Sequence, residues 1–314
     1  MKYGPAVWSF ICLTFIYLFA LIWMDSKSHL FNEVSKLATI LPILFLISLA
    51  SYGVRYARWH WLLKRAGSKI GLTKGFLAYL SGFAFTATPG KVGELIRIRY
   101  LAPMGIAPSL VLGAFIFERA FDLISVLLLS AVAISDPNIF LFVLGFVTIL
   151  LLTLYFFARR PAFLLSASKW LLQKKCIRAS RLISMLGEGL TFTLQWMNFI
   201  NIGASLILGL VAWGLTSAAF LILLHYLGIA LPFFTSFAIY PLAMLAGAAS
   251  MIPGGLGSTE ASITALLMLH GVSIGLAAVA AIGIRLATIW FAILIGFISL
   301  MLLEIRKDDN LSKT

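Results

Sequence analysis

Charged residues are scarce in this sequence. Of its 314 residues, 11% are charged and 61% are hydrophobic, whereas ordinary soluble domains carry about 25% charged and about 45–50% apolar residues. A soluble fold cannot bury that much apolar surface. The apolar residues also form blocks longer than about 18 residues, which is the length that separates a membrane span from a buried core helix. The composition therefore excludes an ordinary soluble protein and predicts a multi-span membrane protein.

Cysteine and recognisable cofactor motifs are equally sparse. Cys12 lies in the first apolar block and Cys176 in a basic stretch, so the two belong to different compartments and form no disulfide framework. The four histidines show no metal-ligand spacing with cysteine or carboxylates. The sequence contains no Gly-x-x-x-x-Gly-Lys-Ser/Thr motif. We therefore expect no metal, no cofactor, no ATP hydrolysis and no enzymatic activity on this chain.

Acidic residues are few, since 11 Asp and Glu stand against 24 Lys and Arg and give a net charge of +13. The basic residues gather at 55–74 and 159–181, and neither stretch contains an acid. Short basic loops beside spans stay in the cytoplasm and lie against anionic headgroups. The pattern thus favours membrane topology over nucleic-acid binding and predicts cytoplasmic termini in the inner membrane. Arg55 and Arg58 stand beside two tryptophans, which indicates an interfacial anchor.

Long and short apolar blocks alternate along the chain. Two of the shorter blocks are too short to cross a hydrocarbon core of about 30 Å as straight helices at 1.5 Å per residue. The sequence therefore predicts an all-α polytopic transmembrane helical bundle with about six full spans and two broken or re-entrant helical elements. The full spans are expected at 6–24, 37–54, 108–134, 138–158, 201–225 and 274–303, and the shorter blocks at 75–88, 233–250 and 259–270.

We expect all of 1–314 to form a single transmembrane domain with two halves. The first half covers about 1–158, a basic cytoplasmic loop covers about 159–185, and the second half covers about 186–305. The first apolar block is about as long as a full span and does not close with small residues, so we expect it to remain as an anchor and not as a cleaved signal peptide.

Each half carries a similar Pro-Gly element. Residues 88–94 read Thr-Pro-Gly-Lys-Val-Gly-Glu, and residues 252–260 read Ile-Pro-Gly-Gly-Leu-Gly-Ser-Thr-Glu. Proline lacks an N–H and glycine tolerates positive φ, so such a pair can end one half-helix and start another. The free N–H groups at the new helix start can cradle a phosphate. The candidate backbone positions are Pro89, Gly90, Pro253, Gly254 and Gly255.

The likeness continues downstream of both elements. Glu94 is followed 25 positions later by Arg119, and Glu260 is followed 25 positions later by Arg285. The charge-derived topology lets the first element enter from the cytoplasm and the second from outside, which is the arrangement of an inverted repeat. Transporters built in this way bind substrate near mid-membrane, between discontinuous helices. The alternative is that each Pro-Gly pair only makes a turn between spans.

Ionisable residues inside the predicted spans need partners, because each costs about 2.5–3.5 kcal/mol on insertion scales. Arg119 precedes Asp122 by three positions and can pair with it, which leaves Glu118 without a partner on that helix. Arg285 has no acid in its own span and needs a carboxylate such as Glu260, Glu94 or Glu118, or a lipid phosphate. These charges are either structural ion pairs or a headgroup site.

Two further arginines follow the first Pro-Gly element. Arg97 and Arg99 stand two positions apart on a predicted helix flank. They are expected either to collect phosphate headgroups from the inner leaflet or to form a solvated cytoplasmic face.

Taken together, the motif at 88–94, the group Glu118-Arg119 with Asp122, and the motif at 252–260 resemble the lysylphosphatidylglycerol synthase transmembrane-region family. The resemblance runs through about residues 5–305. It implies the flippase-like domain of the multiple peptide resistance factor, which moves aminoacylated lipid to the outer leaflet. Because the sequence ends at Thr314 without a soluble aminoacyl-transferase domain, we expect a stand-alone form that does not itself make lysyl-lipid.

The leading hypothesis is a lipid flippase or lipid transporter that moves a phospholipid or a polyprenyl- or hopanoid-type lipid between leaflets. Arg119 and Arg285 would bind a phosphate of an anionic or zwitterionic headgroup. The carboxylates would balance these arginines, receive a cationic headgroup moiety or carry a coupling proton. They are Glu94, Glu118, Asp122 and Glu260.

Two other hypotheses stay open. The first is a membrane scaffold that positions a lipid- or glycan-synthesising enzyme through its basic loops. The second is an intramembrane lipid-phosphate transferase with Glu118 or Asp122 as its base.

Overall fold

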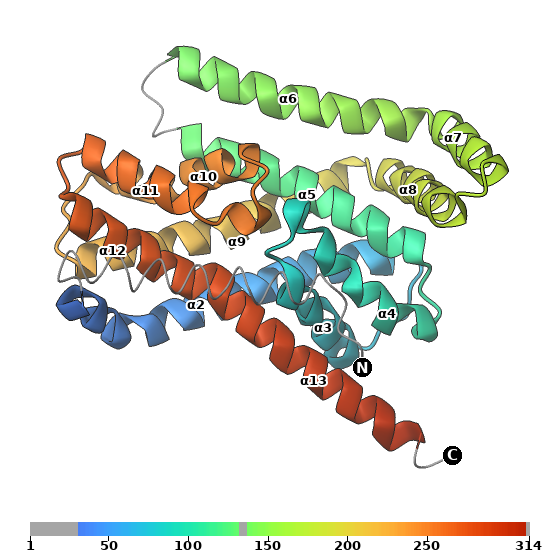
Figure 1. Cartoon of the computed structure of the whole chain (residues 1–314), viewed down its shortest axis with the longest axis horizontal. Helices are drawn as coiled ribbons and strands as arrows, with labels where there is room; N and C mark the ends of the chain where they lie inside the picture. Colours follow the sequence, from blue (N-terminus) through green and yellow to red (C-terminus); the bar gives the residue numbers. More distant parts are fainter. Residues whose placement is uncertain (1–30, 132–136, 312–314) are drawn as a thin grey trace.

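The structure is a computed structural model that describes residues 31–131 and 137–311. These residues form helices joined by short connections, and this part of the chain contains no strand. The predicted all-α class is therefore confirmed. The apolar block 6–24 lies outside the described residues. Figure 1 shows the helices as a layered bundle in which α2, α9 and α12 run side by side beneath α5, α10 and α11.

Four helical stretches in the described part are long and apolar enough to cross a membrane, as judged by length and composition. The expected spans 37–54, 138–158, 201–225 and 274–303 all fall on them. These stretches belong to α2 (Phe31–Arg65), α6 (Pro137–Arg159), α9 (Phe199–Tyr226) and the continuous run of α12 (Ile274–Arg285), the π-helical turn η6 (Leu286–Trp290) and α13 (Phe291–Leu311). The chain is thus a multi-pass membrane protein.

Helix α5 (Pro108–Ser130) occupies the predicted span 108–134 and has a different character. Its 23 residues give a length of about 35 Å, which is enough to cross a bilayer. However, Glu118, Arg119 and Asp122 lie in its middle, and α5 packs against α2, α8, α9 and α10. Protein contacts therefore cover much of this helix.

The three shorter apolar blocks form short helices around the Pro-Gly elements. In the first half, α3 (Leu72–Ser81) leads through the 3₁₀ turn η1 (Gly82–Phe85) to η2 (Pro89–Ile96). Helix α4 (Arg97–Leu101) and the turn η3 (Ala102–Met104) then connect to α5. In the second half, α10 (Phe233–Ala249), η5 (Pro253–Gly255) and α11 (Ser258–Leu269) follow one another. The entry of these elements from opposite membrane faces, and with it the inverted repeat, stays a prediction.

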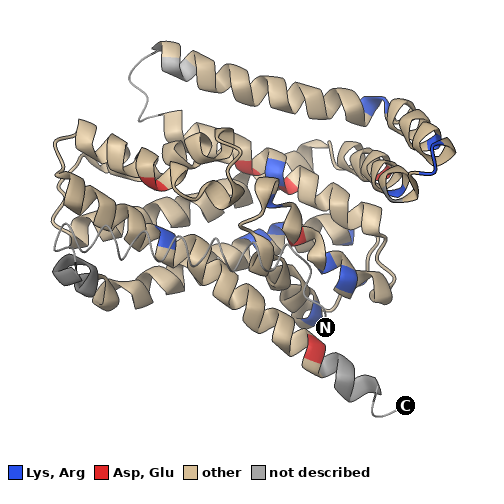
Figure 2. Ribbon diagram, viewed as in Figure 1, with Lys and Arg blue, Asp and Glu red and all other residues tan. Residues whose placement is uncertain are grey.

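The basic stretch 55–74 does not start as a surface loop, because α2 continues to Arg65. Arg58 is 1% exposed and Arg55 is 9% exposed. The prediction that these two arginines form an interfacial anchor was therefore wrong. The physical reason is that both guanidinium groups find carboxylate partners inside the bundle, as described below. Figure 2 shows acidic and basic positions close together where α2 and α5 pass the first Pro-Gly element.

The basic stretch 159–185, expected as a loop, is also largely helical. Helices α7 (Pro161–Gln173) and α8 (Ile177–Gln195) pack against each other, and α8 packs against α5. The Ser168 hydroxyl donates to the Ser180 carbonyl oxygen at 2.9 Å, which fixes the pair. Much of the predicted loop is thus a helical hairpin attached to the bundle.

Close backbone approaches hold the short elements against the long helices. Gly296 of α13 lies so close to Ala84 of η1 that any side chain at this position would clash with the Ala84 backbone. The α13 helix therefore packs directly on η1 and α3. This contact places the start of the first Pro-Gly element beside the last span.

Candidate functional site

Asp122 stands at the centre of a buried ion-pair cluster. Its carboxylate accepts from Arg58 at 2.6 Å and from Arg55 at 3.1 Å, both on α2. Arg119, one turn earlier on α5, lies 3.2 Å away, so the pairing expected from the spacing of three is present. Two of the three guanidinium groups belong to the basic stretch 55–74, which was predicted to be a cytoplasmic loop.

Glu118 is 0% exposed and lies beside four polar or charged side chains. The Tyr79 hydroxyl of α3 donates to its Oε1 at 2.5 Å. Arg58 and Arg119 lie 3.4 and 3.3 Å from the same oxygen, and Arg97 of α4 lies 3.8 Å from Oε2. The expectation that Glu118 has no partner on its own helix was therefore wrong, since Arg119 of α5 lies beside it. Its other partners lie on other elements, which the sequence of α5 alone did not reveal.

Glu94 and Arg97 form a pair beside the first Pro-Gly element. Arg97 donates to Glu94 Oε2 at 2.9 Å and to the Glu94 carbonyl oxygen at 3.0 Å, and the Thr86 hydroxyl donates to Glu94 Oε1 at 2.8 Å. Arg97 is 0% exposed, so both surface roles considered for it were wrong. Its neighbour Arg99 is half exposed and pairs with Glu304 at 3.0 Å.

Arg285 pairs with Glu260, one of the carboxylates suggested by the sequence. Arg285 Nε donates to Glu260 Oε1 at 2.8 Å, and another nitrogen donates to the Gly254 carbonyl oxygen at 2.7 Å. Glu260 also accepts from the Gly257 backbone N–H at 2.8 Å at the start of α11. The second-half arginine therefore holds both its Pro-Gly turn and the helix that follows it.

The two Pro-Gly elements contact each other inside the bundle. Gly90 and Gly254 have nearly the same left-handed conformation, with φ of 60° and 64°. A Cβ on Gly254 would lie 3.1 Å from the Ala87 Cα of the first element. Lys91 also has positive φ, at 58°, which a side-chain-bearing residue rarely adopts.

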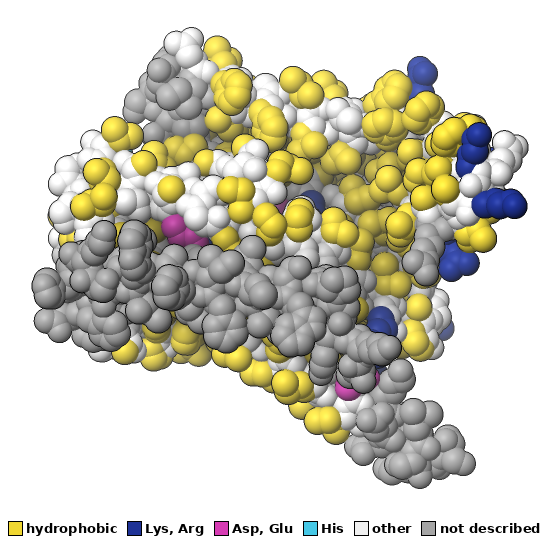
Figure 3. Space-filling view, viewed as in Figure 1, with side chains coloured by type: hydrophobic (Ala, Val, Ile, Leu, Met, Phe, Trp, Pro, Cys, Tyr) yellow, Lys and Arg dark blue, Asp and Glu magenta, His cyan; other side chains and the backbone are white. Residues whose placement is uncertain are grey.

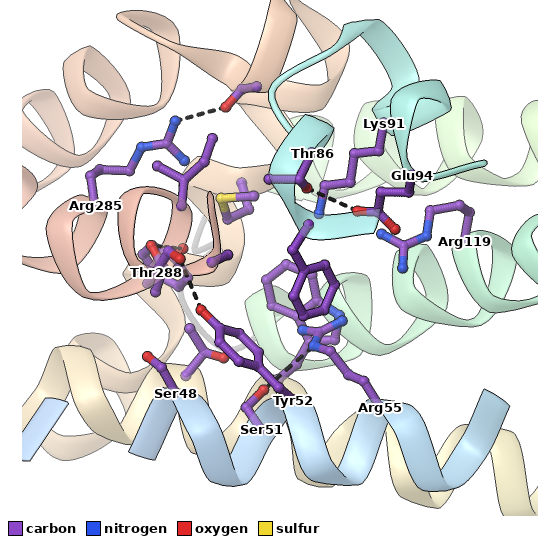
Figure 4. A pocket seen from close by; sticks show the side chains of 18 residues that line it. Ser48, Ser51, Tyr52, Arg55, Thr86, Lys91, Glu94, Arg119, Arg285 and Thr288 are labelled. Atoms are coloured by element: carbon purple, nitrogen blue, oxygen red, sulfur yellow. Dashed lines mark hydrogen bonds between the residues drawn. The ribbon is translucent and has the colours of Figure 1, made fainter. Parts of the chain in front are cut away.

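A cavity of about 90 Å³ lies where the two elements meet. Figure 4 shows its wall, with Arg285 and Thr288 on one side and Lys91, Glu94 and Arg119 on the other. Residues from both halves of the sequence therefore line one space. The polar and charged lining residues are Ser48, Ser51, Tyr52, Arg55, Thr86, Lys91, Glu94, Arg119, Thr216, Tyr240, Arg285 and Thr288.

The structure brings part of the predicted site to this cavity. Arg119, Arg285, Glu94 and Gly254 line it. The other predicted side chains stand behind the wall as partners of lining arginines, Glu118 and Asp122 with Arg119, and Glu260 with Arg285. The remaining predicted backbone positions do not line the cavity, although they shape the two turns. These are Pro89, Gly90, Pro253 and Gly255.

Several lining residues were missed by the sequence reading. Arg55 was predicted to lie at the membrane surface. Lys91 was noted as part of the first Pro-Gly motif, but no binding role was predicted for it. Ser48, Ser51 and Tyr52 are spaced so that they share a face of α2 with Arg55. This polar stripe within an apolar helix was the sequence signal that could have identified them.

Positive charge is in excess around the cavity. Each of the three carboxylates of the first half is already paired, and Lys91 makes no ion pair with any carboxylate of the described residues. Arg119 Nε is buried without a hydrogen-bond acceptor in the same part of the chain. In the first half, five cations stand against three anions, and the Arg285–Glu260 pair of the second half adds one of each. The first-half groups are Arg55, Arg58, Lys91, Arg97 and Arg119 against Glu94, Glu118 and Asp122. This balance suits an anionic group.

The described ranges hold no group of three or more His, Cys, Asp or Glu side chains arranged to bind a metal ion. The charged side chains that line the cavity are those of arginine, lysine and glutamate. Such groups bind and orient a charged ligand.

Comparison with known families gives one match over nearly the whole chain. The model of the lysylphosphatidylglycerol synthase TM region matches residues 8–296. The chain belongs to this family. A UPF0104 membrane protein of Methanothermobacter thermautotrophicus is 30% identical over 118 residues, which cover 38% of this chain and 35% of the relative. The match to that relative thus spans about a third of its length. Family membership connects this protein with membrane lipids in general terms.

Proposed function

We propose that this family member is a lipid flippase or lipid transporter that moves a lipid with an anionic phosphate headgroup between the leaflets of the inner membrane. The observation that carries the proposal is the cavity between the two Pro-Gly elements, with its excess of positive charge. An uncompensated cation inside a membrane protein is costly. A phosphate that enters the cavity offsets this cost.

Three cations would act on the phosphate. Arg119 has an unpaired Nε, Arg285 lines the cavity from the opposite half, and Lys91 lines it from the first Pro-Gly element. Arginine binds phosphate with directed N–H groups, whereas lysine acts as a compact point charge. Glu94 would orient Lys91 or contact a cationic part of a zwitterionic headgroup.

The size of the cavity indicates how much of the lipid enters. A volume of about 90 Å³ is well below the roughly 300–1,000 Å³ of pockets that enclose drug-sized ligands. A phosphate group fits this space, whereas a whole lipid does not. In the proposed transport cycle the acyl chains stay in the bilayer, and the Pro-Gly elements separate to let the headgroup pass.

The test is leaflet exchange in liposomes that contain a panel of labelled lipids. We expect protein-dependent exchange of an anionic phospholipid, and we expect Lys91→Met to lower its rate at least tenfold. Arg99→Gln is the matched control, because it removes one positive charge from a pair outside the cavity. If the wild-type protein exchanges no lipid in the panel, transport is excluded.

The same preparation distinguishes the two other hypotheses. A scaffold for a lipid- or glycan-synthesising enzyme should keep its partner binding and function in Arg285→Ala, whereas a headgroup site should lose lipid binding. An intramembrane transferase should change the lipid chemically, which mass spectrometry of the recovered lipids would detect. A flippase returns them unaltered.

A further inference from the structure

Helix α6 is the least embedded of the candidate spans. Only 11% of its most apolar window is buried inside the protein, compared with 44% for α9. Figure 1 shows α6 along the outer edge of the bundle, and it packs mainly against α8 and α5. Large apolar side chains such as Phe142 and Ile149 are 76% and 67% exposed. Lipid must therefore supply most of the contacts of this helix.

An apolar cavity of about 430 Å³ lies between α6 and the rest of the bundle. Helices α5, α6, α8 and α9 form its wall, and we call it the α6 slot. Its lining contains three residues with hydroxyl groups and no charged residue. Of these, the Thr193 hydroxyl is already bonded to the Leu190 carbonyl oxygen at 2.6 Å. The wall thus suits a hydrocarbon chain.

The α6 slot is separate from the charged cavity. Phe117 and Phe121 of α5 line the slot, whereas Glu118 and Arg119 belong to the ion-pair cluster. The two spaces share no lining residue. A ligand in the slot would therefore be additional to the proposed transport substrate.

The length of the slot matches one leaflet. On α6 its lining runs from Thr148 to Ala158, which at 1.5 Å per residue spans about 15 Å. The hydrocarbon core of a bilayer is about 30 Å thick. An acyl chain that starts at the Ala158 end would reach the middle of the membrane at the Thr148 end.

Two arginines stand at the end of the slot where a headgroup would lie. Tyr155 lines both the slot and a surface groove that includes Arg159 and Arg160. Arg159 Nε donates to the Tyr155 hydroxyl at 3.0 Å, and the Arg160 guanidinium lies 5.0 Å from the centre of the Phe156 ring. Arg159 is the last residue of α6, and the carboxyl end of a helix favours a cation.

The surroundings of this end of the slot are strongly basic. The sequence has no acid between Asp136 and Glu188, and seven lysines and arginines lie in that interval. Figure 3 shows basic side chains gathered among hydrophobic ones at the end of the molecule that carries α7 and α8. Such a rim favours an anionic lipid over a neutral one.

We propose that the α6 slot is a second lipid site, which holds an acyl chain of an anionic phospholipid whose phosphate contacts Arg159 and Arg160. The lipid comes from the leaflet on the side of α7 and α8. It fills the space that α6 leaves against α5, α8 and α9, and so holds this span in place. The site is independent of the transport function proposed above.

The test is native mass spectrometry of the full chain in detergent, titrated with phosphatidylglycerol or phosphatidylcholine. We expect tighter binding of phosphatidylglycerol, and we expect the exposed double variant R159Q/R160Q to lose about tenfold in its affinity. The control K174Q/K175Q removes two charges from the turn between α7 and α8, away from the slot. An equal loss in the control would overturn the proposal, since general surface electrostatics would then explain the preference.

A second variant tests the hydrocarbon part of the site. Thr148→Phe places a ring in the inner end of the slot and should weaken the binding of both lipids without changing the preference between them. Glycerol 3-phosphate at millimolar concentration should not compete, because it has no acyl chain. Competition by this compound, or unchanged binding in a folded Thr148→Phe protein, would exclude an acyl-chain site.

Discussion

The two Pro-Gly elements share a spacing of 25 positions from glutamate to arginine, yet the charges around them are arranged differently. In the second half, Glu260 and Arg285 pair with each other at 2.8 Å. In the first half, Glu94 pairs with Arg97, and Arg119 pairs with Glu118 and Asp122. Among the described residues, the matched glutamate and arginine of the second half thus pair with each other, whereas those of the first half belong to a larger network.

This difference separates two roles for intramembrane charge. The first-half network joins α2, α3, α4 and α5, and its members are almost fully buried except for Arg119, whose side chain is 20% exposed. Removing one member leaves a buried charge without its partner. The free-energy cost of that unpaired charge exceeds the net stabilisation that the intact pair provides. The Glu260–Arg285 pair joins α11 and α12, and Arg285 also donates to the Gly254 carbonyl oxygen of the turn. The first half is therefore expected to be more sensitive to mutation than the second.

The largest effect is expected for Asp122→Asn. This change leaves Arg55, Arg58 and Arg119 without their shared carboxylate and should destabilise the protein by about 3–5 kcal/mol. Thermal unfolding of the purified protein in detergent measures it. A melting temperature close to that of the wild type would show that the cluster is not a structural network.

Glu260→Gln should have a smaller effect, about 1–3 kcal/mol, because Arg285 keeps its hydrogen bond to the Gly254 carbonyl oxygen. The same unfolding experiment provides a direct comparison with Asp122→Asn. If the two changes prove equally destabilising, the contrast between the halves is lost.

The backbones of the two Pro-Gly turns can be compared by substituting one glycine in each. Gly254→Ala introduces a Cβ at φ 64° and 3.1 Å from the Ala87 Cα, whereas a Cβ on Gly90 meets only Val92 Cγ2, at 3.8 Å. Both changes add backbone strain of about 1 kcal/mol, and the first adds a steric clash between the elements. We expect Gly254→Ala to be the more destabilising and to slow lipid exchange more.

The smallest effect is expected for Glu304→Gln, which breaks the pair with Arg99, whose side chain is 52% exposed. Exposed pairs contribute about 0–1 kcal/mol, so the melting temperature should change little. The rate of lipid exchange should stay at the wild-type value. A strong loss of exchange in this variant would show that the transport path runs outside the cavity.

The amino-acid sequence by itself determined the class of the protein and the outline of its site. Long apolar blocks predict spanning helices because their burial in lipid depends only on local composition. The two Pro-Gly elements and the charges at 118–122 could also be identified from the sequence, because each differs in residue type from its apolar neighbours.

The tertiary structure alone decided which charges are buried. Arg55 and Arg58 lie at the end of an apolar block and looked like membrane-surface residues, because the acid that pairs with them is 64 or more positions away in the sequence. The partner of Arg97, Glu94, stands three positions before it, but the burial of this pair follows only from the packing of α4 against α3 and α5. An arginine is stable inside a membrane protein only beside its partner, and long-range packing decides where that partner lies.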